Sequence, residues 1–306
     1  MNRLSRERRA DLLHLLNDGL SIRAAGRFTK TKPDTIVKLV VDAGWACLLE
    51  HHRRVRNLTC ATVQVDEIWS FVGKKAHRMS EAERRWGRGD AYTFTALDPD
   101  SRLLVAWMVG PRTRATAAYF LRDLSRCIRG RFQLTTDAAG YYADAAEFAF
   151  RDRPWSQRVD YAQIWKHSVP RDHISHVPKT ERVPLVIYGD PDPGDIATTY
   201  VERHNLTMRM EMRRFHRRTN AHSKKVDNHA HAVATHAFQY NFVRPHGTLT
   251  RLMNGKPTTP AMAAGLAERP WSWAEVVQLI EAQEPTARDV AARRKDRRTA
   301  SLVRTT

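Results

Sequence analysis

Apolar positions follow a helical period in the first part of the chain. Leucines recur three or four residues apart in the stretch 12–20, and Gly19 stands where a first helix would end. Ser21 is a suitable N-cap for a second helix, and Pro33 suits the first turn of a third, which would end at Gly44. The pattern therefore predicts helices joined by tight turns in this part of the chain.

This layout is typical of a helix-turn-helix, in which the second helix of the motif enters the major groove of DNA. The exposed face of that helix would carry Lys32, Thr35 and Lys38. An ordinary helical bundle or a dimerisation element would give the same pattern, but the basic side chains that cluster here favour DNA binding. Residues 45–60 contain few core residues, and we interpret them as a connection to the next domain.

After this connection the apolar pattern changes to that of strands. Residues 62–72 are rich in β-branched and aromatic side chains, which is the composition of a buried strand. Further strands are predicted at 91–98, 102–110, 131–138 and 161–169, with a helix after the third strand and another after the fourth. The first strands are antiparallel, and a right-handed crossover follows them. We therefore predict an α/β fold with a mixed sheet flanked by helices.

The second half of the chain is less regular. Residues 178–195 are rich in proline and glycine and are predicted to form a loop. Residues 196–220 are predicted to form one long helix that carries many arginines. Two short helices follow, and the segment after Thr286 is so basic and so poor in core residues that we expect a disordered tail.

The net charge of the chain is strongly positive. Its 306 residues include 51 Lys and Arg against 33 Asp and Glu, which gives a formal net charge of +18. Such an excess indicates a polyanionic partner, and nucleic acid is the first candidate. An anionic membrane surface is the alternative, but the apolar runs are much shorter than the roughly 20 residues of a membrane span. Because the N-terminal residues contain no apolar signal-peptide core, we expect a cytoplasmic protein.

The cysteines do not predict a metal site. Cys47, Cys60 and Cys127 are widely spaced and fit neither a disulfide framework nor a C-x-x-C pattern. We therefore expect three buried thiols.

Three acids stand out by their places in the predicted elements. Asp66 lies in the middle of the first strand, Asp137 lies near the end of the fourth, and Glu202 lies on the long helix. If the first and fourth strands are neighbours, Asp66 and Asp137 lie side by side, and a helix packed on the sheet brings Glu202 within reach. Converging carboxylates repel one another unless hard cations are bound, and oxygen ligands favour Mg²⁺ or Mn²⁺. Two such ions clamp the attacking and leaving oxygens of a phosphoryl transfer.

Each acid also has a plainer interpretation. Asp66 and its neighbour Glu67 could face solvent or pair with an arginine, and Glu202 could be a surface acid paired with Arg203 or Arg209. His204 follows Glu202 closely and is left without a role. Basic side chains near the acids would hold a phosphate backbone, and the DNA-binding candidates of this region are Lys74, Lys75, Arg203, Arg209, Arg213 and Arg217.

The acids lie in three long motifs, VDEIWSFVGKK, TTDAAGYY and YVERHNLTMRMEMRRFHRRT. These motifs resemble the acid-bearing segments of bacterial insertion-sequence transposases of the DDE class, in particular the insertion-sequence-one type. The later segments YNFVRPHGTL and TPAMAAG are similar to segments that follow the last acid in such enzymes. The resemblance covers roughly residues 60–265.

The resemblance implies a ribonuclease-H-like catalytic fold with two Mg²⁺ ions, for which Asp66, Asp137 and Glu202 would be the ligands. It also implies the reaction, in which hydrolysis frees a 3′-hydroxyl at the element end and this hydroxyl attacks target DNA. Such enzymes act as multimers on double-stranded DNA, so a homo-oligomer is expected. Some relatives begin with a Cys-rich zinc-binding segment, whereas this chain has no cysteine before Cys47 and the predicted helix-turn-helix stands in its place.

Together these observations predict three parts. Residues 1–56 would form the helix-turn-helix domain and linker, residues 57–250 the ribonuclease-H-like domain, and residues 251–306 short helices and a basic tail. The predicted function is that of a metal-dependent DNA transposase. A non-catalytic DNA-binding regulator derived from a transposase, and a metal-dependent DNA nuclease that cuts without joining, are the alternatives.

Overall fold

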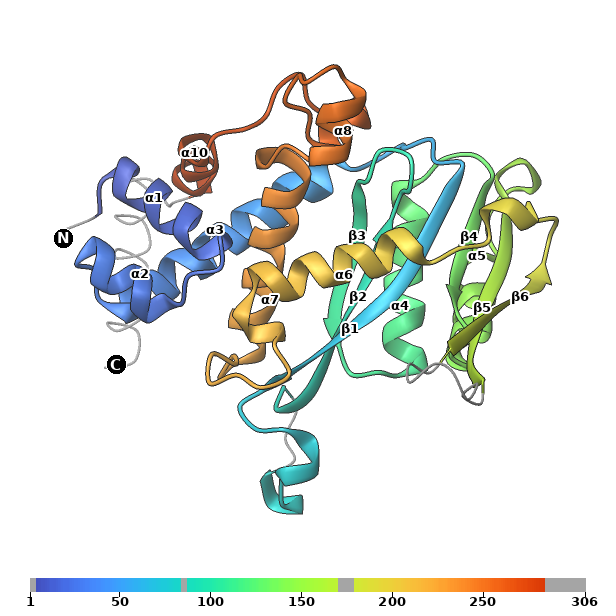
Figure 1. The fold of residues 1–306 in the computed structure, drawn as a ribbon, viewed down its shortest axis with the longest axis horizontal. Coiled ribbons are helices and arrows are strands. Elements are labelled where there is room, and N and C mark those ends of the chain that lie inside the picture. The colour runs from blue at the N-terminus through green and yellow to red at the C-terminus, as the bar shows by residue number, and fades with distance from the viewer. Residues whose placement is uncertain (1–3, 84–86, 170–178, 284–306) are drawn as a thin grey trace, which may run out of the picture.

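The fold is built on one mixed sheet with helices on both faces (Figure 1). The computed structural model describes residues 4–83, 87–169 and 179–283. Its six strands lie in the order β3-β2-β1-β4-β5-β6. Their bounds are β1 Thr62–Val72, β2 Gly89–Leu97, β3 Leu104–Gly110, β4 Phe132–Asp137, β5 Val159–Val169 and β6 Lys179–Tyr188.

The directions of the strands follow from their connections. β1, β2 and β3 form an antiparallel meander, in which residues 73–88 connect β1 to β2 and residues 98–103 connect β2 to β3. β4 is parallel to β1, and β5 is parallel to β4, because a helix intervenes before each of them. β6 returns antiparallel to β5. Three antiparallel strands followed by two parallel strands form a ribonuclease-H-like sheet, so the predicted fold class is confirmed.

Two helices cover one face of the sheet. α4 (Arg114–Cys127) and α5 (Tyr141–Phe150) bury their apolar sides there, and α4 is capped by the side chain of Thr113. Phe94 of β2, Phe120 of α4 and Tyr142 of α5 are fully buried, and the ring of Phe94 contacts both of the others. The main core of the protein lies in this layer.

The opposite face carries α6 (Thr199–Glu211) and α7 (Val226–Phe238). A second, smaller core lies beneath them, in which Ile68 of β1 packs with Met208 and Phe215. The predicted helix over 196–220 is wrong in length, because α6 ends at Glu211 and a short 3-10 turn at Arg213–Phe215 follows. The chain turns there because Met212 and Phe215 are both drawn into the core.

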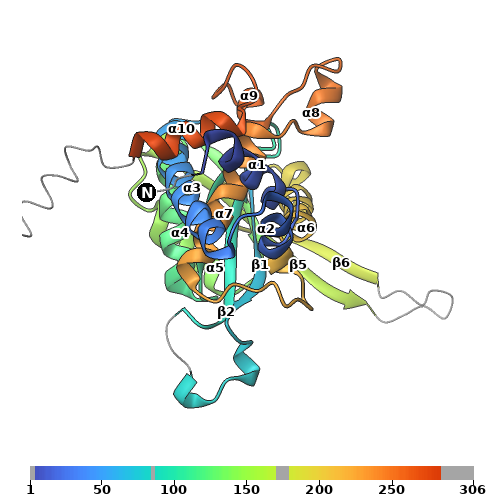
Figure 2. The same ribbon diagram turned by 90° about the vertical axis from the view of Figure 1, so that its left-hand side faces the viewer.

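The predicted loop over residues 178–195 is also wrong, since β6 occupies the first part of it. Val183, Val186 and Ile187 supply β-branched side chains, and Pro184 is tolerated because β6 is an edge strand. β5 and β6 extend away from the body of the protein as a two-stranded ribbon (Figure 2).

The N-terminal helices are α1 (Arg6–Asn17), α2 (Ile22–Thr29) and α3 (Pro33–Arg54), with Ser5 and Ser21 as N-caps. The predicted end of the third helix at Gly44, and the connection expected to follow it, are wrong. Gly44 lies inside α3, at a point where α7 passes so closely that a Cβ atom would lie 2.3 Å from the carbonyl oxygen of His231. This glycine therefore permits close packing of two helices instead of ending one.

The last helices return to the N-terminus. α10 (Trp273–Gln283) packs against α1 and α3 (Figure 2), and Glu281 accepts hydrogen bonds from Arg6 and Arg9. The basic tail predicted after Thr286 lies outside the described residues. The remaining short elements are α8 Gly247–Leu252, α9 Pro260–Ala263, a π-helical turn Gln239–Val243 and the 3-10 turns Ala76–Arg78, Glu81–Glu83, Trp155–Gln157 and Pro193–Asp195.

Candidate active site

Asp66 and Asp137 meet because of the register of two neighbouring strands. The parallel pairing of β1 with β4 ends at Gln64 opposite Thr135, and each acid stands two residues further along its strand. Side chains two apart on a strand share a face. One carboxylate oxygen each of Asp66, Glu67 and Asp137 lies within 4.8 Å of the others. Within the described parts of the chain, no other three acidic, histidine or cysteine side chains gather in this way.

Burial and neighbouring charges raise the pKa of two acids in this group, Asp66 and Asp137. Burial, followed by the charges of Glu67 and Asp137, raises the pKa of Asp66 from 3.8 to about 6, and the ammonium of Lys166 partly offsets the rise. The pKa of Asp137 is also raised, first by burial and then by the charge of Glu67. A raised pKa means that the ionised carboxylate is disfavoured. A bound cation would therefore stabilise the ionised forms of Asp66 and Asp137.

Glu67 is held on the side of the sheet that carries α5. Its carboxylate accepts hydrogen bonds from the hydroxyl groups of Tyr141 and Tyr142, the second at 2.8 Å, and from Arg112 Nε at 2.6 Å. Its side chain is only 3% exposed. Arg112 also approaches Asp137, with 3.7 Å between Nη2 and Oδ2. The sequence alone left it open whether Glu67 faces solvent. In the structure, the side chain of Glu67 is buried and held in a fixed position beside Asp66 and Asp137.

Asp66 is held from the other side of the sheet by α6. Asn205 Nδ2 donates a hydrogen bond to Asp66 Oδ2 at 3.0 Å, and the hydroxyl of Thr95 contacts both the Asn205 side chain and the Asp66 carbonyl oxygen. Gln64 anchors the start of α6, because its side-chain oxygen accepts from the amide of Tyr200 at 2.8 Å. No sequence pattern pointed to Asn205 or Gln64 as site residues. The signal for Asn205 was its place one turn after Glu202 in the third motif.

Glu202 does not join the three-oxygen group. Its carboxylate accepts hydrogen bonds from Lys166 Nζ at 2.6 Å, Arg182 Nη2 at 2.8 Å and the hydroxyl of Thr198 at 2.8 Å. Burial alone would raise its pKa, but these hydrogen bonds hold the pKa of Glu202 below its ordinary value. The alternative pairing with Arg203 or Arg209 is wrong, because the cations at Glu202 come from β5 and β6.

Lys166 links Glu202 to the acid group. It lies on β5 two residues beyond Ile164, which pairs with Asp137. Its ammonium contacts Glu202 directly, and its charge lowers the pKa of both Asp66 and Asp137. The three acids chosen from the sequence therefore surround one lysine, although only two of them share the close oxygen group.

The donor set fits a hard divalent cation. Carboxylate oxygens are the ligands that Mg²⁺ and Mn²⁺ prefer, and three of them converge here from two strands. Burial and mutual repulsion already oppose the ionised state of Asp66 and Asp137, so a bound cation would relieve both. The described cysteines are free and buried, as expected, and take no part in this site.

The basic candidates occupy several surfaces. Lys32, Thr35 and Lys38 are exposed along the start of α3. Lys74 is bound to Glu83 at 2.8 Å, and Lys75 lies over the ring of Trp69. The four candidates on α6 and the segment after it are exposed or half-buried, namely Arg203, Arg209, Arg213 and Arg217.

His204 faces away from the acids. It is buried against Tyr240, with 4.4 Å between ring centroids, and lies 6.1 Å from the ring of His236. Burial lowers its pKa to about 3, and His236 and His246 contribute to the shift. It is therefore a neutral core side chain in this structure.

The chain is 26% identical over 180 residues to Insertion element iso-IS1n protein InsB of Shigella dysenteriae. This chain resembles insertion-sequence proteins. The match covers 58% of this chain and 95% of the insertion-element protein, and the resemblance inferred from the three acidic motifs is confirmed by it. No protein-family model matches the chain.

Solved structures of two complexes align with parts of this chain. The piggyBac transposase synaptic complex with hairpin DNA aligns with a TM-score of 0.46 and 12% identity, over 94% of this chain and 74% of that one. The Mos1 Strand Transfer Complex aligns with a TM-score of 0.22 and 12% identity, over 52% of this chain and 59% of that one. Among the described residues, no helix of this chain is both long enough and apolar enough to cross a membrane.

Proposed function

We propose that this chain is the DNA transposase of an insertion sequence, which cuts the element ends and joins their 3′-hydroxyls to target DNA by metal-dependent phosphoryl transfer. The convergence of Asp66 and Asp137 on neighbouring strands, with raised pKa values, is the observation that supports this proposal best. The likeness to an insertion-element protein and the net charge of +18 support it independently.

Asp66, Asp137 and Glu202 would hold two ions of Mg²⁺ or Mn²⁺. Such ions, when bound, stabilise the charge that develops on the attacking and leaving oxygens. Glu67 lies close enough to contribute an oxygen, or to orient the other two through its own fixed position. Asn205 keeps the carboxylate of Asp66 in place, and Arg112 keeps that of Glu67 in place.

DNA is the proposed partner. We assign binding of the element end and of target DNA to the basic residues of α6 and the segment after it, with Lys74 and Lys75, and sequence recognition to the exposed start of α3. Phosphate contacts of this kind position a duplex without reading its sequence, whereas a helix in the major groove reads bases. A homo-oligomer on DNA and a location in the cytoplasm complete the proposal.

The proposal is tested by an assay of strand joining with the full chain. Precut DNA carrying the inverted repeats that flank the coding region is mixed with target plasmid and Mg²⁺ or Mn²⁺, and joined products are counted. Asp66→Asn, Asp137→Asn and Glu202→Gln should each reduce joining roughly 100-fold or more, since each removes charge needed in the transition state. Asp144→Asn is the matched control, because Asp144 is an exposed acid paired only with Arg114 among its described neighbours.

The same assay separates the alternatives. Full joining by Asp66→Asn would refute the proposed chemistry. DNA binding by the wild-type chain without metal-dependent cutting would indicate a regulator. The observation that favours this alternative is that Glu202 is ion-paired with Lys166 and Arg182. Cutting of the ends without joining would indicate a nuclease.

A further inference from the structure

The helix α3 leaves one face uncovered along most of its length. Figure 1 shows this helix running from the N-terminal helices to the body of the protein. Residues three or four positions apart lie on one face of a helix. The residues of α3 that follow this spacing and are exposed or half-buried are Thr35, Lys38, Asp42, Trp45, Leu49 and Arg53. The face is therefore polar at its start and apolar in its second half.

Trp45 and Leu49 form the apolar part of this face. Trp45 is 51% exposed and Leu49 is 42% exposed, although they lie one turn apart on the same helix. Half-buried Val41 and Leu48 border them on one side. Two large apolar side chains that lie together on the surface mark a contact with another apolar surface, and tryptophan is enriched among the residues that dominate binding at protein interfaces.

Charges of opposite sign stand at the two ends of this apolar pair. Asp42 precedes Trp45 by one turn, and no cation of the described residues lies within 4 Å of its carboxylate. Arg53 follows Leu49 by one turn, and its side chain is 65% exposed. Glu50 is shared between Arg53 and Arg54, so this end of the face keeps a net positive charge.

This face is complementary to a second copy of itself when the two helices run antiparallel. If the pairing is centred near residue 47, Trp45 of one protomer meets Leu49 of its partner, and Asp42 of one protomer lies near Arg53 of its partner. Each of these contacts then occurs twice, as a two-fold axis requires. A parallel pairing would instead place like charges opposite each other, which is unfavourable.

Antiparallel pairing also leaves the start of α3 free. Because α3 ends at Arg54, an overlap centred near residue 47 begins near residue 40, and Lys32, Thr35 and Lys38 lie beyond the end of the partner helix. At a rise of 1.5 Å per residue, positions 35 of the two helices would lie about 36 Å apart along the helix direction. This separation is about one turn of B-DNA, which is the spacing of the two half-sites that a helix-turn-helix dimer reads.

From these observations we infer that the face of α3 around Trp45 and Leu49 is a self-association surface, through which two copies of this chain pair antiparallel about a two-fold axis. The proposed function includes a homo-oligomer but does not say which surface forms it. The inference names that surface, and it does not require the acids to catalyse joining.

Sedimentation velocity of the full chain tests the surface. The protein is measured over a series of concentrations without DNA or metal, in salt that screens its net charge of +18. The wild type should shift from monomer to dimer as its concentration rises. Trp45→Ala and Leu49→Ala should each raise the dissociation constant of the dimer about tenfold or more. Alanine has the highest helix propensity, so α3 is retained in both variants.

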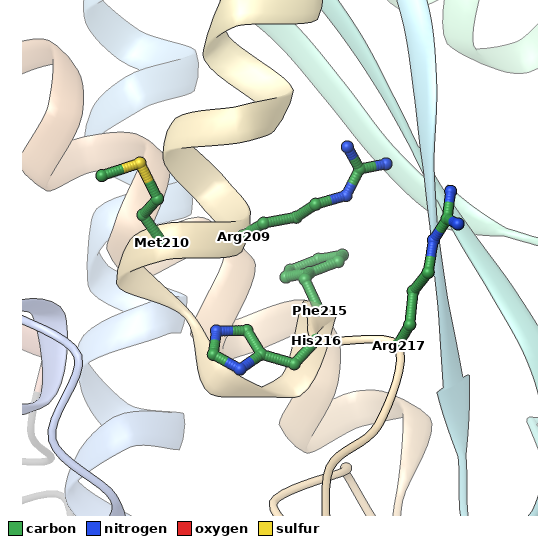
Figure 3. A pocket seen from close by; sticks show the side chains of 5 residues that line it. All are labelled: Arg209, Met210, Phe215, His216 and Arg217. Atoms are coloured by element: carbon green, nitrogen blue, oxygen red, sulfur yellow. The ribbon is translucent and has the colours of Figure 1, made fainter. Parts of the chain in front are cut away.

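Two control variants remove exposed apolar surface elsewhere. Trp155→Ala removes the same side chain at a position that is 76% exposed. Met210→Ala removes a side chain on α6 that is 66% exposed and extends on the opposite side of the helix from Arg209 and Arg217 (Figure 3). Both controls should dimerise as the wild type does.

Exchange of charge tests the direction of pairing. Asp42→Lys and Arg53→Glu should each weaken the dimer, because each places like charges opposite each other. A mixture of the two variants should form heterodimers about as tightly as the wild type forms its dimer. In the heterodimer one contact joins the two introduced charges, and the other keeps the native pair of Asp42 and Arg53.

A wild-type chain that stays monomeric up to about 100 μM would overturn the self-association surface. Dimerisation of Trp45→Ala and Leu49→Ala as tight as that of the controls would overturn it as well. A mixture of the charge variants that fails to dimerise would overturn the antiparallel pairing. Because DNA and metal are absent, none of these results depends on the outcome of the joining assay.

Discussion

Asn205 and Asp66, 139 positions apart in the chain, are joined by a hydrogen bond of 3.0 Å from Nδ2 to Oδ2. This bond fixes α6 to the central strand β1 at the level of the acid group. Asn205 itself is buried and Asp66 is half-buried, so Asn205 has little access to water as an alternative partner. The position of Asp66, and with it the geometry of the whole candidate site, depends on the docking of this one helix.

Replacement of Asn205 by alanine should destabilise the protein and loosen the site. The variant leaves the half-buried Asp66 carboxylate without this donor, at an expected cost of about 1–3 kcal/mol in the free energy of unfolding. Urea denaturation measures this cost. Asn220→Ala is the control, because Asn220 is exposed, and equal stability of the two variants would contradict the role of the bond.

Replacement of Lys166 by glutamine should strengthen binding of divalent cations. The ammonium of Lys166 occupies Glu202 and attracts Asp66 and Asp137, so it competes with any other cation at these acids. A titration with Mn²⁺ at pH 8, where the carboxylates are ionised, should give a dissociation constant several-fold lower than that of the wild type. Lys38→Gln removes the same charge on the exposed face of α3 and should change nothing. Unchanged or weaker Mn²⁺ binding by Lys166→Gln would show that the lysine does not compete.

The stability of the metal-free protein should depend on the ionisation of Asp66. Its pKa is raised from 3.8 to about 6, so the folded state binds this proton more tightly than the unfolded state does. The resulting stabilisation is complete below pH 3.8 and is lost as the pH rises through about 6. Two pKa units correspond to about 3 kcal/mol at most.

This dependence is isolated by comparison with Asp66→Asn, which cannot ionise. Between pH 4 and pH 7, the unfolding free energy of the wild type should fall relative to that of the variant. Buried His204, whose lowered pKa acts in the opposite direction, is common to both chains and cancels. A difference that stays constant with pH, or that reverses, would contradict the raised pKa. Added Mg²⁺ should restore the unfolding free energy that the wild type loses at pH 7.

Replacement of Gly44 by alanine should separate α3 from α7. Inside a free helix this change would stabilise by up to about 1 kcal/mol. Here the new methyl group would lie 2.3 Å from the carbonyl oxygen of His231, and overpacking of this kind costs about 1–3 kcal/mol. Thermal unfolding should therefore show a lower Tm. Gly140→Ala is the control, since nothing lies within 4 Å of its added Cβ atom, and a Tm for Gly44→Ala that equals or exceeds the control's would contradict the close approach.

Local pattern was enough to predict five of the six described strands and the helices α4 and α5. Apolar residues that repeat every two positions in strands, or every 3.6 positions in helices, lie on one face of the element. In this protein those faces are buried in the main core. The errors share a cause. Gly44, Pro184 and Phe215 each carry a local signal whose outcome depends on a distant neighbour: α7 at Gly44, the edge position of β6 at Pro184 and the second core at Phe215.

The candidate site divides in the same way. The sequence by itself determined that Asp66 and Asp137 lie on strands, and it predicted that they stand together if those strands are neighbours, which the register of β1 and β4 provides. Only the tertiary structure decided that Glu67 completes the close group, that Asn205 holds Asp66, and that cations from β5 and β6 hold Glu202. These contacts join segments far apart in the chain, and they depend on how helix and ribbon dock on the sheet, which no local pattern encodes.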